Sequence, residues 1–182
     1  MVNPVDRVAL RDAIDELETN GDDGVGVGEE PIGLMSTDTV SRDADTAREA
    51  LLGTIETEVL DGFERIEFHV ADGEDVGYRV GYTDTVPTSI AGEPVEVDGV
   101  AMLEVSLVGA SGVDLTGPEP DVIYTGPDRF TLDDLTMVEE IAAVTDQHGA
   151  MSWVIGTTDE APFAVGLLDE PFRLVIDISV ST

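Results

Sequence analysis

The sequence contains no cysteine and no lysine, and each absence excludes a kind of chemistry. Without cysteine the chain has no disulfide, no thiolate nucleophile, no Cys-based zinc site and no lipobox anchor. All eight cationic side chains are arginines, against 40 Asp and Glu, which gives a formal net charge of -32 over 182 residues. Phosphate-binding surfaces need clustered Lys or Arg, so this balance argues against nucleic acid as a partner. It also disfavours anionic membranes.

Long hydrophobic runs are missing as well. No stretch of about 18 apolar residues occurs, which predicts that no helix spans a membrane. The N-terminal residues, Met1 to Arg7, have no apolar core and do not form a signal peptide. A chain that is complete as it stands would therefore be expected in the cytoplasm.

The acidic residues are spread over the whole chain rather than gathered in one tail. Such an excess of one charge destabilises a compact state by self-repulsion unless dense counter-ions screen it. At about 1 M salt the Debye length falls to about 3 Å, so neighbouring carboxylates hardly sense one another. Disorder does not explain the acidity, because 42% of the residues are apolar. The composition predicts a folded protein adapted to very high salt.

Residues 1–20 are predicted to form an α-helix. Asn3 can cap it, Pro4 suits its first turn, and Asn20-Gly21 supplies the stop. Its apolar stripe consists of Leu10, Ala13, Ile14 and Leu17. Two interpretations stay open: the helix covers an open edge or face of a sheet, or it binds a partner through that stripe.

Residues 21–50 form an acidic, Gly-rich connector in which we expect little regular structure. The residues at 46–52 suit either a short helix or the approach to a first strand. From residue 51 to residue 182 the apolar pattern changes to a period of two, which predicts a β domain.

A hairpin is the clearest element of this β domain. Ile66, Phe68 and Val70 alternate with polar residues after the turn signal Asp61-Gly62, so one face should be wet. Arg65, Glu67 and His69 are the polar residues expected on that face.

Further short strands are separated by Gly, Pro and Asp turns, with about nine or ten strands in total. The fold class predicted is mostly β, an antiparallel β-sandwich or barrel with an N-terminal α-helix. The strands expected after the hairpin lie at 78–82, 95–97, 100–108, 122–124, 136–145, 151–156, 163–168 and 172–178.

Several segments of this domain also resemble a known family. Their order and spacing are similar to those of the AMIN-like domain of actinobacterial envelope proteins over roughly residues 50–180. The segments concerned are Asp61–Phe68, Gly77–Tyr82, Gly92–Val97, Tyr124–Arg129, Ser152–Gly156 and Pro171–Asp177.

This resemblance implies an all-β, non-catalytic module that binds or localises at the cell envelope through a glycan or a protein. AMIN domains, which are related, localise periplasmic amidases and secretins, by contact with peptidoglycan. Family members usually follow a signal peptide and often a lipobox cysteine, whereas this chain begins with a capped helix. The alternative is an intracellular protein-interaction or structural protein of a halophile with the same fold.

No catalytic or metal-binding motif stands out. His69 and His148 lack ligand spacing such as HExxH, and no serine lies in a GxSxG turn. Acidic pairs are abundant throughout, so their presence at any one place has little meaning. The sequence therefore predicts no catalytic residue, no metal ligand, no cofactor and no enzymatic activity.

Aromatic residues make up only 5% of the chain and give the candidate ligand-binding set. Trp153 lies in phase with Met151 and Ile155, which favours the core over a sugar-stacking platform. For a glycan or peptide site the candidates are Tyr78, Arg79, Tyr82 and Tyr124. Tyr78 and Tyr82 share one face of a strand, with hydroxyls expected near solvent, and Arg79 points the other way.

Overall fold

The computed structural model describes residues 30–44, 50–72 and 76–180, and within these ranges the regular structure is all strand. The mostly β prediction is therefore confirmed, while the helix predicted at 1–20 lies outside the described residues. The long strands are β2 (Ala50–Leu60), β3 (Phe63–Ala71), β4 (Gly77–Tyr82), β5 (Ala101–Val108), β10 (Val138–Gln147), β11 (Ala150–Thr157), β12 (Phe163–Leu168) and β13 (Arg173–Ser179). The short ones are β1 (Val40–Arg42), β6 (Ala110–Ser111), β7 (Val113–Asp114), β8 (Asp121–Val122) and β9 (Arg129–Thr131). No helix long and apolar enough to cross a membrane is found among the described residues.

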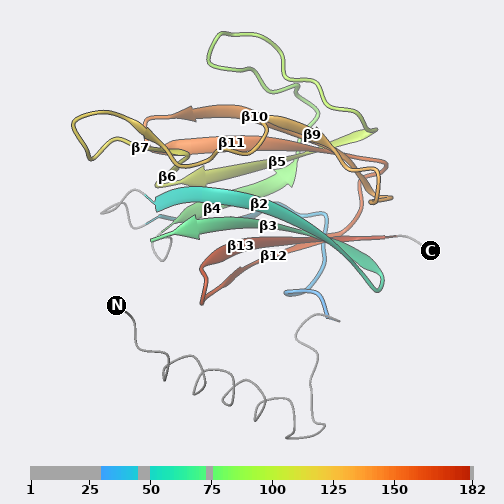
Figure 1. Ribbon diagram of the computed structural model, residues 1–182. Coiled ribbons are helices and arrows are strands. Elements are labelled where there is room, and N and C mark those ends of the chain that lie inside the picture. The colour runs from blue at the N-terminus through green and yellow to red at the C-terminus, as the bar shows by residue number, and fades with distance from the viewer. Residues whose placement is uncertain (1–29, 45–49, 73–75, 181–182) are drawn as a thin grey trace, which may run out of the picture.

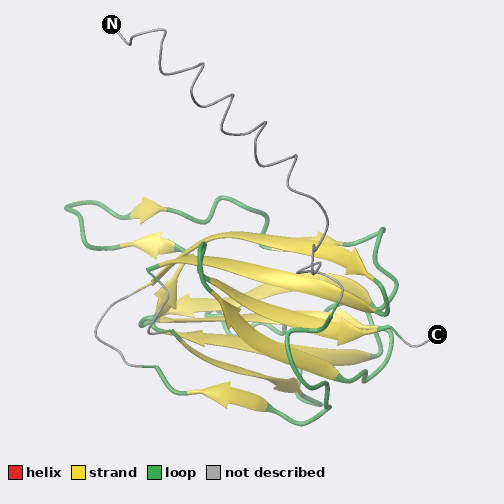
Figure 2. Cartoon of the chain, turned by 90° about the horizontal axis from the view of Figure 1, so that it is seen from below, coloured by secondary structure: helices red, strands yellow, loops and turns green. Residues whose placement is uncertain are grey.

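Two sheets stack face to face, as the two layers in Figure 1 show. One has six strands in the order β1-β4-β5-β11-β10-β9, and the other has five in the order β12-β13-β3-β2-β6. Pairing is antiparallel except between β2 and β6. Strands β7 and β8 form a separate two-stranded ribbon, which projects beyond the longer strands in Figure 2. Of the two predicted architectures, the sandwich is the one this arrangement matches.

Glycine-containing turns are present where the long strands reverse, including the one predicted at Asp61-Gly62. Gly62 adopts a φ of 84° in the two-residue connection between Leu60 and Phe63. His148 and Gly149 have φ values of 56° and 69° between β10 and β11. Two positive φ values in a two-residue loop, as at His148 and Gly149, match the twist of the flanking strands. Glycine adopts a positive φ at no steric cost.

The main core lies between the sheets and follows the predicted alternation. Ile66, Phe68 and Val70 of β3 are at most 2% exposed, as is Trp153 of β11. The rings of Phe68 and Trp153 meet edge-on with centroids 6.3 Å apart. Trp153 is therefore a core residue, as its phase predicted.

A smaller cluster covers the opposite face of β10 and β11. Val95 packs there on Ala142, Val144 and Val154, and Figure 1 places the loop between β4 and β5 above these strands. The strand predicted at 95–97 is wrong, because this segment has no strand neighbour. The backbone N–H of Val95 donates to Pro87, and that of Asp98 donates to a carboxylate oxygen of Glu140.

Part of the predicted connector joins both sheets. Strand β1 pairs with β4, with Val40 opposite Val80. Ser36 exchanges backbone hydrogen bonds with Phe163 of β12, at 2.9 Å in each direction. A three-residue strand is too short to show alternation, so the sequence pattern did not reveal it.

The face of β3 that was predicted to be wet is largely covered, which corrects that prediction. Arg65 is 6% exposed, and its guanidinium donates to both carboxylate oxygens of Asp177, at 2.7 and 2.8 Å. The backbone N–H of Ile32 donates to the same carboxylate at 2.6 Å. The segment that contains Ile32 thus covers part of this face, because a Cβ on Gly166 would lie 2.4 Å from the Ile32 side chain.

Glu64 joins the two sheets at one end of the sandwich. It is 1% exposed, and its carboxylate accepts hydrogen bonds from the backbone N–H groups of Thr136, Met137 and Val138. The Thr136 hydroxyl also donates to it, at 2.9 Å. One carboxylate therefore satisfies the donors where the chain enters β10.

Candidate functional site

The four residues predicted for ligand binding do not converge. Tyr78 and Tyr82 of β4 pack against the main core, and Arg79 between them is exposed. The Tyr82 hydroxyl donates to the carbonyl of Ala161 at 2.9 Å rather than pointing to solvent. Burial raises the pKa of Tyr82. Tyr124 lies elsewhere, after β8, where it lines a groove.

This groove has a volume of about 440 Å³ and is built from four parts of the chain. Its floor comes from β10 and β11, one wall from the loop between β4 and β5, and another from the β7–β8 ribbon. The segment after β8 completes it. The residues that line it are Ser89, Ile90, Ala91, Gly112, Val113, Val122, Tyr124, Asp128, Ala143, Val144, Thr145, Asp146, Met151 and Trp153.

An aromatic pair is part of the lining of the groove. The rings of Tyr124 and Trp153 meet edge-on with centroids 5.4 Å apart. The Tyr124 hydroxyl donates to the carbonyl of Pro127 at 3.0 Å, and a Cβ on Gly126 would lie 2.6 Å from that hydroxyl. The turn at Gly126 therefore holds the ring in place. Burial raises the pKa of Tyr124, and the nearby carboxylate of Asp128 raises it further.

A carboxylate anchors one wall. Asp146 accepts hydrogen bonds from the backbone N–H of Gly112 at 2.8 Å and from the Ser111 hydroxyl at 3.3 Å. These contacts attach the start of the β7–β8 ribbon to the end of β10. Asp128 adds an exposed carboxylate to the groove. Asp128 and Asp146 thus place two carboxylates in the groove.

The rim of the groove is apolar and open to solvent. Ile90 is 61% exposed and Val122 is 60% exposed. On the floor, the indole N–H of Trp153 is buried and has no hydrogen-bond partner among the described residues. An unsatisfied buried donor costs about 1–3 kcal/mol, so an acceptor that reached it would gain affinity.

The chemistry available in the groove suits binding. Neither histidine is among the described residues that line it: His69 lies on β3 and His148 at the tip of the β10–β11 turn. Ser111 neighbours a carboxylate but no imidazole. General acid–base or nucleophilic catalysis needs such convergent groups.

Cross-strand register forms a second cluster that sequence motifs do not show. Glu56 of β2 lies opposite Glu67 of β3, and His69 follows two residues later on the same face. Their ligand atoms all lie within 4.8 Å of one another. The three side chains are thus close enough to share one metal ion, although the sequence predicted no metal ligands.

Of the four candidate residues, Tyr124 lines the groove; Trp153 and Met151 were predicted as core residues, and the sequence singled out none of the other lining residues. Ile90 offered one weak signal, since it is a large apolar residue between Ser89 and Ala91 in a segment with turn composition. Asp146 offered none, because it was one acid among 40 Asp and Glu.

Comparison with known proteins identifies the family of the β domain. The model of the AMIN-like domain matches residues 50–180, which includes every strand from β2 to β13. No curated protein and no solved structure matches the chain at a significant level. The groove and the cluster on β2 and β3 both lie within the matched range. The chain therefore belongs to the AMIN-like domain family.

Proposed function

We propose that this chain is a non-catalytic binding module that holds a cell-envelope glycan or protein in the groove beside Tyr124 and Trp153. The family supports this proposal, since AMIN-like domains are typically binding or localisation modules of envelope proteins. The observation on which it depends is the open groove with its aromatic pair and apolar rim. Ligand pockets commonly combine such apolar lining with a few polar groups that fix orientation.

The negative charge in and around the groove limits the class of ligand that can bind there. The groove contains the carboxylates of Asp128 and Asp146, and the chain has a formal net charge of -32. At high salt the net charge is screened, but an anionic group bound in the groove would still lie close to these two carboxylates. A neutral or amine-bearing glycan, or a protein segment with a basic side chain, suits the groove better.

The tryptophan and the two exposed rim residues give a direct test of the groove. Trp153 is the only tryptophan and it lines the groove, so a change in its fluorescence on addition of ligand measures binding. The variants Ile90→Ser and Val122→Ser should bind purified envelope polysaccharide, or an envelope protein fraction, about fivefold more weakly. This follows from about 1 kcal/mol of lost apolar burial for each.

Val59→Ser is the matched control. Val59 is 57% exposed on β2, away from the groove, so its replacement should change the affinity less than twofold. Equal binding by all three variants would show that the groove is not the site. Binding to neither ligand class at any salt concentration would contradict the proposed function itself.

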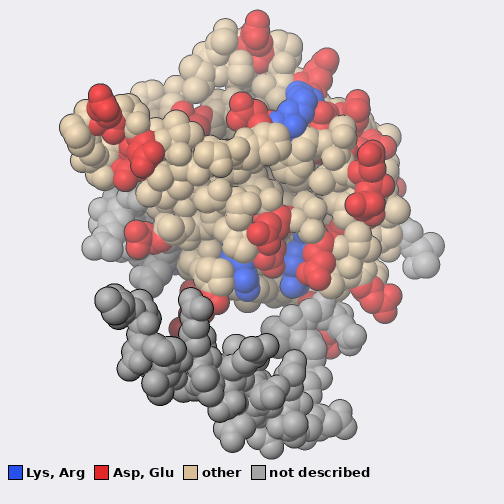
Figure 3. Space-filling model, viewed as in Figure 1, with Lys and Arg blue, Asp and Glu red and all other residues tan. Residues whose placement is uncertain are grey.

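Adaptation to high salt is part of the proposal. On the face shown in Figure 3, Asp and Glu side chains occupy many separate places and Lys or Arg only a few. Dense counter-ions would screen this excess. The melting temperature should rise by about 10 °C or more, roughly 3 kcal/mol, between about 0.1 M and about 3 M KCl. Circular dichroism measures this, and a melting temperature independent of KCl would contradict the adaptation.

A further inference from the structure

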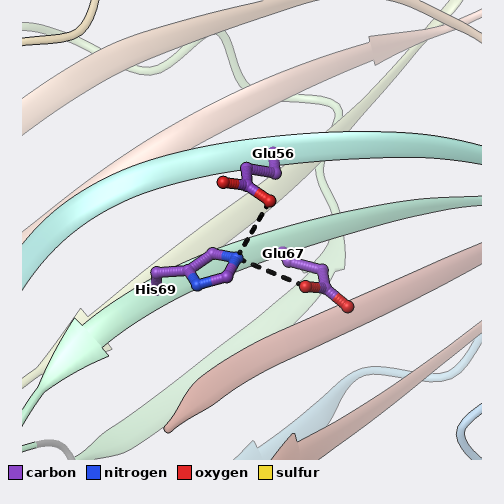
Figure 4. A group of neighbouring side chains, drawn as sticks. All are labelled: Glu56, Glu67 and His69. Atoms are coloured by element: carbon purple, nitrogen blue, oxygen red, sulfur yellow. Dashed lines mark ion pairs between the residues drawn. The ribbon is translucent and has the colours of Figure 1, made fainter. Parts of the chain in front are cut away.

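A mixed cluster of two carboxylates and one imidazole lies on the outer face of the five-stranded sheet. Figure 4 shows the Nε2 atom of His69 directed between the carboxylates of Glu56 and Glu67. Two of the residues come from β3 and one from β2, and the antiparallel register fixes their spacing. The cluster therefore rests on the most regular part of the fold rather than on a loop.

The distances in this cluster are those of metal ligands. His69 Nε2 lies 3.5 Å from an oxygen of Glu56 and 3.3 Å from an oxygen of Glu67. Zinc bonds of about 2.0–2.2 Å to nitrogen and oxygen give tetrahedral edges of roughly 3.3–3.6 Å. The two distances from His69 Nε2 therefore match zinc coordination, and the ligand atoms of Glu56 and Glu67 lie within 4.8 Å of each other.

The imidazole nitrogen gives an independent indication. His69 Nε2 is fully buried and has no hydrogen-bond partner among the described residues, although two carboxylates are near. The side chains of His69 and Glu67 are only 20% and 17% exposed, whereas Glu56 is 63% exposed. Two ligands are thus held in place, and the third lies on the solvent side, where an ion can enter.

We propose that Glu56, Glu67 and His69 bind a divalent transition-metal ion of the zinc class, with water as the fourth ligand. Imidazole together with carboxylate suits zinc better than it suits magnesium or calcium, which prefer oxygen ligands. The chain has no cysteine and only two histidines, so nitrogen ligation depends on His69 or His148. The site goes beyond the proposed function, because it lies on the other sheet from the groove.

Two arginine side chains oppose the binding of a cation at this cluster. Arg173 of β13 lies opposite His69, and its Nε is 3.5 Å from an oxygen of Glu67. Arg65 adds a second positive charge near Glu67. The two carboxylates still outnumber the adjacent guanidinium of Arg173, and Arg65 is paired with Asp177. Removing the charge of Arg173 should tighten metal binding by roughly two- to fivefold.

Isothermal titration with ZnCl₂, and separately with MgCl₂, tests the site on the full chain. We expect one zinc ion per chain, binding weakened at least about tenfold in His69→Ala and Glu67→Gln, and binding tightened in Arg173→Gln. The matched controls are His148→Ala and Glu58→Gln, which should stay within twofold of the unchanged protein. Glu58 is exposed on the same face of β2 as Glu56.

Glu56, the exposed ligand, provides a variant that separates loss of zinc binding from loss of folding. Glu56→Gln should weaken zinc binding while leaving the metal-free melting temperature unchanged, since Glu56 is largely exposed. The imidazole ¹⁵N signals should shift with zinc for His69 and not for His148. Equal zinc binding by His69→Ala, or magnesium binding as tight as zinc binding, would indicate ions held loosely by surface carboxylates and would overturn the proposal.

Discussion

Replacing Asp177 by asparagine is expected to lower the free energy of unfolding by about 3–5 kcal/mol, because it leaves a buried guanidinium without its counter-charge. Asp177 is fully buried, and both of its oxygens accept hydrogen bonds from Arg65. The hydrogen bond to Asp177 is the main reason that the pKa of Arg65 is raised, so Arg65 stays charged at any ordinary pH. Asparagine keeps the shape of the side chain, but it removes the charge and replaces one of the two acceptor oxygens by an amide donor.

Urea unfolding, followed by circular dichroism at high salt, measures this loss. Asp169→Asn is the matched control, since Asp169 is exposed between β12 and β13, and it should change stability by less than about 0.5 kcal/mol. The double variant Arg65→Met with Asp177→Leu should recover part of the loss, because it removes both charges. A loss below about 1 kcal/mol in Asp177→Asn would show that this pair is solvated rather than buried.

The second large effect is expected at Glu64. Replacing it by alanine removes the acceptor for three backbone N–H groups and one hydroxyl, at Thr136, Met137 and Val138. Each buried donor left without a partner costs about 1–3 kcal/mol, so a total loss of about 4 kcal/mol is expected after water enters. The same unfolding measurement applies.

Hydrogen exchange adds a local signature for Glu64→Ala. The amides at 136–138 should lose protection more than those in the centre of β11, because the two sheets are joined at that end by Glu64. Glu139→Ala is the control, since Glu139 is exposed on β10. If both variants unfold at the same urea concentration, Glu64 does not join the sheets as described.

The sequence predicted the central strands well because their pattern is local. In β3, Ile66 and Phe68 alternate with polar neighbours, and Asp61-Gly62 supplies the turn. These signals lie in neighbouring residues of the sequence and do not depend on which strand pairs with β3. The family resemblance over residues 50–180 was likewise confirmed, since it rests on segments in sequence order.

The failures all concern contacts between distant parts of the chain. Arg65 was placed on a wet face, because its burial depends on Asp177 and on the segment at Ile32. Val95 was assigned to a strand, although it packs on the outer face of β10 and β11. Apolar alternation cannot distinguish a strand from a loop that buries the same side chains.

The groove and the cluster of Glu56, Glu67 and His69 could not be predicted either, because both are formed by residues from separate segments. Tyr124 was a candidate, but its neighbours in the groove, Ile90 and Asp146, come from segments far away in sequence. The cluster of Glu56 with His69 depends on the register of the β2–β3 hairpin. A composition so rich in carboxylates gave no reason to single these residues out.

The most direct test of the account is a ¹H–¹⁵N correlation spectrum of the labelled chain, titrated with purified envelope polysaccharide and then with an envelope protein fraction. The single indole N–H signal, from Trp153, should move together with the amides of Ile90 and Val122. The amides of β2 and β3 should stay in place. Shifts confined to β2 and β3, or no shifts with either ligand, would contradict the claim that this groove is the binding site.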